Sequence, residues 1–203
     1  WKTNFHTFKP SPHLVVKPTW ENYRPAPGEK VLEIDPGMCF GTGYHGTTQA
    51  CISFLDSLSS TLGAVPLIDA GCGSGILSMA ALKLGYRPIY AFDNDKDAVD
   101  ITRKHLGNFS KQNYNVIHSE LQDYEPPHSF PLVAANILAP VLLENAEQLV
   151  SFLDNSNDSE SYLILSGILI KQYPEVKEVF EGLGLKEVET KVIDNWKSGC
   201  FVR

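Results

Sequence analysis

The sequence contains few cysteines, and their positions do not suggest a metal site or a disulfide framework. Its 203 residues include only four, and they lie far apart without paired spacing: Cys39, Cys51, Cys72 and Cys200. A chain of this length can bury a hydrophobic core without cross-links, so we expect reduced thiols. The six histidines also lack metal-ligand spacing, and we expect no bound metal.

Long hydrophobic runs and an excess of basic residues are missing as well. The longest apolar run, around residues 163–170, is far too short to span a bilayer, and no signal peptide is visible. The formal net charge is −7, with 17 Lys and Arg against 24 Asp and Glu. General nucleic-acid binding needs the opposite sign. We therefore expect a cytoplasmic protein without a membrane or direct nucleic-acid partner.

From about residue 66 onward, short apolar segments alternate with helical patterns, which is typical of an α/β fold with a mostly parallel sheet. Alternation around residues 194–195 predicts a closing antiparallel hairpin. We expect one compact domain, with an amino-terminal segment at 1–65 before a core at 66–203. Strands are predicted at 14–17, 30–34, 66–70, 88–93, 115–118, 131–136 and 162–166, and helices at 47–58, 75–84, 96–106, 139–153 and 172–180.

The strongest local signal is the segment DAGCGSG at residues 69–75, directly after an apolar stretch. A glycine-rich turn between a strand and a helix lies at the carboxyl edge of a parallel sheet, where open α/β folds bind ligands. Gly71, Gly73 and Gly75 follow the spacing GxGxG, and Ile76 stands where a dinucleotide-binding loop has its last glycine. A phosphate-binding P-loop needs a Lys-Ser/Thr pair after its glycines, and none follows here. The ligand held by these glycines therefore need not carry a pyrophosphate.

Asp93 is predicted to end the next strand, 22 residues after Gly71. An acidic side chain at this position accepts hydrogen bonds from ribose hydroxyls. The alternative is that Asp93 caps the following helix, although Asn94 and Asp95 are better placed for that. A ribose-bearing ligand without a pyrophosphate indicates S-adenosylmethionine as the cofactor.

Five segments together resemble one known family. They are PGMCFGTGYHGTT (36–48), DAGCGSGIL (69–77), AFDND (91–95), AANILAP (134–140) and LSGIL (165–169). They are similar to the PrmA family, whose members methylate the eleventh protein of the large ribosomal subunit, and the resemblance covers the whole chain. It implies a seven-stranded S-adenosylmethionine-dependent methyltransferase fold with the final hairpin inserted into the sheet. It also implies cofactor contacts from Thr48, Gly71, Asp93 and Asn136.

The resemblance further implies the substrate. This chain also departs from the family in two respects. The expected activity is N-methylation of lysine side chains and the α-amine of that large-subunit ribosomal protein. The family usually has proline where this chain has Gly46, so we expect a looser turn before Thr47. The family also carries a separate amino-terminal domain that holds the ribosomal protein, and we expect that domain to be absent from these 203 residues.

Asn136 and His45 are the candidate catalytic residues. The side-chain carbonyl of Asn136 can accept a hydrogen bond from the substrate amine and aim its lone pair at the methyl group; alternatively, this asparagine only forms a turn. His45 is either a general base or a residue that orders its glycine-rich loop through a hydrogen bond. Phe40 either lines the methyl pocket or anchors the loop. Cys72, between two glycines, is expected to be a packed residue and not a nucleophile.

Besides methylation of an amine on another protein, two other functions stay open at this point. Methylation of an amine on a nucleic-acid base would call for an Asn-Pro-Pro-aromatic segment to clamp the base, where this chain has Asn136-Ile137-Leu138-Ala139. The acidic charge also disfavours that alternative. The other is a non-catalytic cofactor-binding module, which turnover of the cofactor with a ribosomal-protein substrate would exclude.

Overall fold

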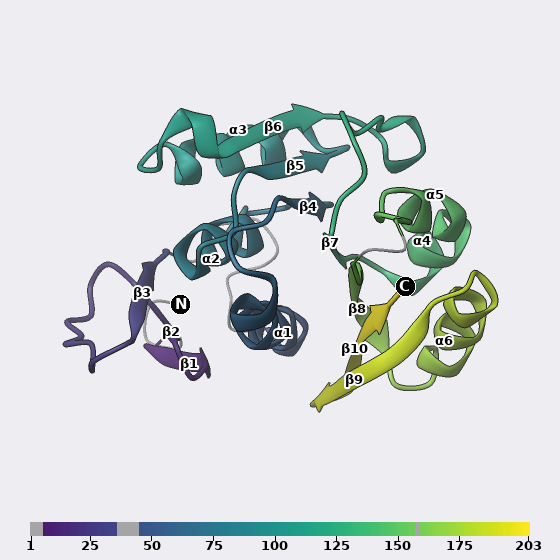
Figure 1. Ribbon diagram of the computed structural model, residues 1–203. Coiled ribbons are helices and arrows are strands. Elements are labelled where there is room, and N and C mark those ends of the chain that lie inside the picture. Colours follow the sequence, from purple (N-terminus) through teal and green to yellow (C-terminus); the bar gives the residue numbers. More distant parts are fainter. Residues whose placement is uncertain (1–5, 36–44, 157–158) are drawn as a thin grey trace.

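The computed structural model describes residues 6–35, 45–156 and 159–203 (Figure 1). Its main sheet has seven strands in the order β6-β5-β4-β7-β8-β10-β9. Strands β4 to β8 are parallel, whereas β10 runs antiparallel to both β8 and β9. This confirms the predicted fold and the inserted hairpin. The strands are β4 (Leu67–Ala70), β5 (Ile89–Asp93), β6 (Tyr114–His118), β7 (Leu132–Asn136), β8 (Tyr162–Leu169), β9 (Lys186–Ile193) and β10 (Trp196–Val202).

Helices cover both faces of this sheet because its central strands are apolar on both sides. Within β4, Leu67 belongs to the core under α1, α2 and α3, and the next residue, Ile68, belongs to the core under α4, α5 and α6 (Figure 1). The helices are α1 (Gly46–Leu62), α2 (Ile76–Leu84), α3 (Lys96–Leu106), α4 (Ala139–Glu144), α5 (Ala146–Ser151) and α6 (Tyr173–Gly182).

Three elements differ by more than two residues in extent from the sequence prediction. Helix α1 continues four residues beyond the expected end at 58, as far as Leu62. The single helix expected at 139–153 is interrupted at Asn145, whose side-chain amide donates to the Val141 carbonyl at 2.9 Å. This side-chain hydrogen bond competes with the regular helical pattern. Strand β8 continues three residues beyond the expected end at 166, as far as Leu169, because β10 pairs along its full length.

A small second sheet precedes α1. It contains β1 (Phe8–Ser11), which the sequence did not predict, β2 (Leu14–Lys17) and β3 (Lys30–Glu33). Strand β1 contains Pro10 and lies at the edge of this sheet, where a missing N–H is tolerated. Helix α1 connects the small sheet to the main one. Its buried face, including Phe54, shares a hydrophobic core with β2, β3 and β4, so the expected boundary at residue 65 does not divide the core.

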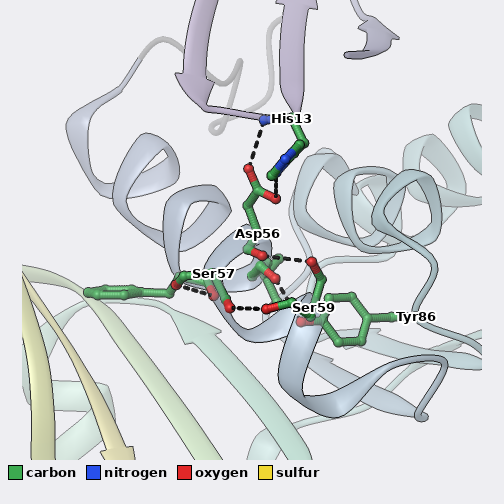
Figure 2. Close-up of polar contacts among 8 residues, drawn as sticks. His13, Asp56, Ser57, Ser59 and Tyr86 are labelled. Carbon is green, nitrogen blue, oxygen red and sulfur yellow. Dashed lines mark hydrogen bonds and ion pairs between the residues drawn. The ribbon is translucent and has the colours of Figure 1, made fainter. Parts of the chain in front are cut away.

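Asp56, on α1, joins the small sheet to the helix (Figure 2). Its carboxylate accepts hydrogen bonds from the backbone N–H of His13 and from its ring Nδ1, both at 2.9 Å. The residue directly before Asp56 on the same helix is also bound, because the Tyr86 hydroxyl donates to the Leu55 carbonyl at 2.7 Å. Burial would raise the pKa of Asp56, but hydrogen bonds to its carboxylate, including those from His13, hold the pKa below its ordinary value.

The three described thiols are buried. Cys51, Cys72 and Cys200 are free cysteines, and burial raises the pKa of Cys51 to about 12 and raises that of Cys72 as well. Such thiols are poor nucleophiles near neutral pH. Cys39 lies outside the described residues. Within the described part of the chain, no helix is long and apolar enough to cross a membrane, and no group of three or more His, Cys, Asp or Glu could hold a metal ion.

We predict that Asp56→Ala lowers the free energy of unfolding by about 1.5–3 kcal/mol, because it removes a charged acceptor from a buried contact. Urea denaturation at pH 7 would measure this, with the exposed Ser60→Ala on the same helix as control. The folded-state pKa of Asp56 lies below its unfolded value. Its contribution is therefore present above about pH 4 and is lost as the pH falls through the folded-state pKa. An unchanged midpoint would show that the contact does not stabilise the fold.

Candidate functional site

A cavity of about 470 Å³ lies at the carboxyl ends of the central strands. This volume is within the usual range for a small-molecule site. The walls come from the ends of β4, β5 and β7 and the turns that follow them, from the short turn at Leu121–Asp123 after β6, and from α4. Of the site residues predicted from the sequence, Gly71, Gly73, Asp93 and Asn136 line this cavity.

The glycine loop uses backbone conformations that other residues rarely adopt. Gly71, Gly73 and Gly75 have φ angles of 73°, 54° and 79°. Gly75 begins α2, and a Cβ added to it would lie 2.9 Å from the Thr102 side chain on α3. Gly75 is not among the described residues that line the cavity. Its observed contact is therefore the close packing of α2 on α3, and its contact with a ligand stays a prediction.

Gly71 and Gly167 enclose Ile137 from two sides. A Cβ on Gly71 would lie 2.5 Å from Cγ2 of Ile137, and a Cβ on Gly167 would lie 2.3 Å from the Ile137 carbonyl oxygen. The Ile137 N–H also donates to the carbonyl of Ser166 at 3.2 Å. These contacts fix the turn directly after Asn136. We did not predict Ile137 or Gly167 as site residues, although a glycine inside a strand often marks a bulge or a close approach of another backbone.

Asp93 holds the glycine loop and the start of α3. Its Oδ2 accepts the N–H of Gly73 at 2.9 Å, and its Oδ1 accepts the N–H of Asp95 at 2.9 Å. A carboxylate has about four acceptor positions, so two remain for hydroxyls of a ligand. Asp95 caps α3, accepting the N–H of Asp97 at 2.9 Å. The cap of α3 is therefore Asp95, one of the two residues that we expected to be better placed for capping than Asp93.

Every charged side chain among the described residues that line the cavity is a carboxylate: Asp69, Asp93, Glu120 and Glu144. Asp69 is buried at the end of β4 and accepts the Ser78 hydroxyl at 2.6 Å. Burial raises the pKa of Asp69 to about 6, against the lowering effect of the hydrogen bonds from Ser78. A cavity with this lining favours a cationic ligand. Sequence analysis missed Asp69 as a site residue, although a charged side chain inside a predicted buried strand is itself a signal.

Asn136 ends β7 and contacts the first turn of α1. Its amide nitrogen donates to Oγ1 of Thr48 in a long hydrogen bond of 3.5 Å. Thr48 is buried and is not among the described cavity-lining residues. The two residues are 88 positions apart in the sequence, yet the fold brings them together. With the nitrogen directed at Thr48, the carbonyl oxygen of Asn136 is the atom left to accept from a substrate.

His45 caps the amino terminus of α1. Its Nδ1 lies 2.8 Å from the Thr47 hydroxyl and accepts the Thr47 N–H at 3.4 Å, and its ring meets that of Trp196 edge-on with 5.0 Å between centroids. An Nδ1 that accepts places the ring proton on Nε2. These contacts involve α1 and β10, and both roles of His45, ordering its loop and acting as general base, stay predictions. Phe40 and the preceding part of the GTGxHxTT segment lie outside the described residues.

Comparison with known sequences matches this chain to one family throughout its length. Residues 1–203 match the family model described as Ribosomal protein L11 methyltransferase (PrmA). The ribosomal protein L11 methyltransferase of Geobacter metallireducens is 38% identical over 196 residues, which are 97% of this chain and 62% of that protein. The protein of the same name from Syntrophomonas wolfei is 40% identical over 183 residues, 88% of this chain and 56% of that protein. This chain spans less than two thirds of the length of these relatives.

Comparison with solved structures agrees with the sequence match. A ribosomal protein L11 methylase from Lactobacillus delbrueckii subsp. bulgaricus superimposes with a TM-score of 0.82 at 27% identity, covering 98% of each chain. The N-methyltransferase NodS from Bradyrhizobium japonicum, in complex with S-adenosyl-L-homocysteine, has a TM-score of 0.63 at 14% identity, covering 79% of this chain and 89% of that one. The second likeness concerns the fold alone. The family match over the whole sequence shows that this chain belongs to the ribosomal protein L11 methyltransferase (PrmA) family.

Proposed function

We propose that this chain is a cytoplasmic S-adenosylmethionine-dependent methyltransferase domain that N-methylates lysine side chains and the α-amine of ribosomal protein L11. The observation that carries the proposal is the convergence of the glycine loop, Asp93 and Asn136 on one cavity lined by carboxylates. Family membership supports the choice of substrate. In this proposal residues 1–65, with the GTGxHxTT segment, and the core at 66–203 form one catalytic domain.

The residues at the cavity fit this cofactor. Asp93 would accept the ribose hydroxyls through its remaining acceptor positions, and Gly71 and Gly73 would let the ligand approach the backbone. Asp69 and the other carboxylates would balance the positive charge of the sulfonium and ammonium groups. When bound, S-adenosylmethionine supplies a methyl group on a positively charged sulfur.

The chain's own task is to present a neutral amine in the correct orientation. A lysine with an ordinary pKa of about 10.4 costs roughly 4.6 kcal/mol to deprotonate at pH 7, and an α-amine near 7.8 costs about 1 kcal/mol. Asn136 would accept an N–H of the amine with its carbonyl oxygen, which turns the amine lone pair away from Asn136. Because its nitrogen bonds Thr48, the amide is held in the orientation that presents this oxygen.

Mass spectrometry of ribosomal protein L11 after incubation with this chain and S-adenosylmethionine tests the proposal. We expect added methyl groups on lysines and on the α-amine. Methyl transfer to a nucleic-acid base, with L11 unmodified, would support the base-methylation alternative. Cofactor binding without transfer to L11 or RNA would indicate a non-catalytic module.

We predict that Asp93→Ala weakens S-adenosylmethionine binding by about 2–4 kcal/mol, because the ribose hydroxyls lose a charged acceptor. Isothermal titration calorimetry measures this directly. The matched control is Asp95→Ala, which removes a neighbouring carboxylate and the cap of α3 but should preserve cofactor affinity. Equal affinity in Asp93→Ala and wild type would place the nucleoside elsewhere.

Asn136→Ala should lower kcat at least about tenfold, with a much smaller change in cofactor affinity, because its proposed contact is with the amine. The exposed Asn115→Ala on β6 is the control. With a lysine substrate the wild-type rate should climb between about pH 7 and 9 as more neutral amine becomes available, whereas an α-amine substrate should level off near pH 8. A flat lysine profile would contradict rate control by the neutral amine.

Cofactor affinity should also fall as the pH drops below about 6, because Asp69 then takes up a proton and no longer offers a negative charge. Calorimetry from pH 5 to 8 would show this change. Asp69→Asn should bind at least about tenfold more weakly at pH 7, a loss of about 1.4 kcal/mol, and should lack the step near pH 6. Asp100→Asn, an exposed carboxylate on α3, should behave like wild type. A wild-type step that persists in Asp69→Asn would assign the titration to another group.

A further inference from the structure

The first turn of α1 rests on the carboxy-terminal hairpin. A Cβ added to Gly46 would lie 2.7 Å from Cγ2 of Ile193 and 3.2 Å from the Ile193 carbonyl oxygen. On the other strand of the hairpin, Trp196 packs against the His45 ring. The described start of the helix is therefore held from outside by β9 and β10.

A buried pair of hydroxyls makes a third contact between the hairpin and α1. Ser166 on β8 donates to the Thr47 carbonyl at 3.2 Å, and its Oγ lies 2.6 Å from Oγ of Ser198 on β10. Either serine can donate in the hydrogen bond between them. Both serines are at most 1% exposed. These contacts link Ser198 through Ser166 to Thr47.

The backbone of β8 is distorted at Ser166 and Gly167, and this distortion sets the direction of the Ser166 side chain. The pairing of β8 with β10 shifts register between Lys197 and Gly199, so that Ser166 and Gly167 on β8 oppose the single residue Ser198. Gly167 has a φ of 84°. This is a β-bulge, which commonly redirects a side chain beside a functional site.

The same turn of α1 carries the partner of Asn136. Thr48 follows Thr47 directly and accepts the Asn136 amide. Asn136 and Ser166 are also opposite each other in the pairing of β7 with β8. The contacts therefore lead from β10 through the bulge on β8 to the first turn of α1, and from there back to Asn136.

We propose that Ser198 is a positioning residue for the amine-binding group, because through Ser166 and Thr47 it holds Thr48 where that side chain orients Asn136. This inference rests on the proposed function, in which Asn136 contacts the amine. Without the Ser198 hydroxyl, Ser166 loses the partner that lies 2.6 Å from its Oγ and can turn away from Thr47. The orientation of the Asn136 side chain is then less restricted. Ser198 does not contact Asp93 or the glycine loop, so the positions of these cofactor-binding groups are unchanged.

Steady-state kinetics and calorimetry on Ser198→Ala test this. We expect kcat to fall about fivefold while the Kd for S-adenosylmethionine stays within about twofold of wild type. The matched control is Ser161→Ala, another serine that is 1% exposed, whose hydroxyl donates to the Asp154 carbonyl at the far end of β8. It removes the same atom and a similar hydrogen bond but should keep wild-type kcat. An equal loss of kcat in both variants would overturn the proposal.

Two further measurements separate positioning from a general loss of stability. If Ser198 acts through Asn136, adding Ser198→Ala to Asn136→Ala should cause no further loss of kcat, whereas independent effects would multiply and contradict the proposal. The second measurement needs no substrate: the side-chain amide signal of Asn136 in a ¹⁵N–¹H NMR spectrum, assigned by its loss in Asn136→Ala. It should shift in Ser198→Ala and not in Ser161→Ala. An unmoved signal would overturn the inference even if the protein has another substrate.

Discussion

The site depends on the close packing of one turn between two glycines. Ile137 has its side chain against Gly71 and its backbone against Gly167, and both approaches are shorter than any side chain would allow. The turn after β7 can therefore lie between the glycine loop of β4 and the bulge of β8. This places Asn136 at the cavity, because it is the residue directly before that turn. A side chain at either glycine position would push this turn, and Asn136 with it, out of place.

The second constraint is electrostatic. Asp69 and Asp93 lie on neighbouring strands, and each has protein donors: the Ser78 hydroxyl for Asp69, and the backbone of Gly73 and Asp95 for Asp93. Burial of the Asp69 carboxylate is unfavourable, as its raised pKa shows. A cationic ligand would offset that cost, and a neutral ligand would not. The carboxylates that hold the glycine loop and the strand ends therefore also favour a positively charged ligand.

The residues of the site differ in how well the sequence alone could identify them. Asp93 was predicted because it ends an apolar strand, and the carboxyl ends of parallel strands meet at one edge. Asn136 was predicted because the segment AANILAP resembles that of the family. Ile137 and Ser198 were not predicted. Neither has a composition or spacing that distinguishes it, since their roles come from partners that are distant in the sequence. His45 was singled out by its glycine-rich neighbours, but its contacts with Thr47 and Trp196 depend on where the hairpin lies.

By itself, the sequence determined the order and type of most elements, the parallel core, the closing hairpin and the position of the glycine loop. These follow from local hydrophobic period, turn residues and the rule that parallel strands share one edge. Only the tertiary structure decided the extension of β8 and the hydroxyl pair at Ser166. Each of these depends on a hydrogen bond or on strand pairing that local patterns do not encode. In the same way, the acidic lining of the cavity became evident only when side chains from four parts of the chain were brought together.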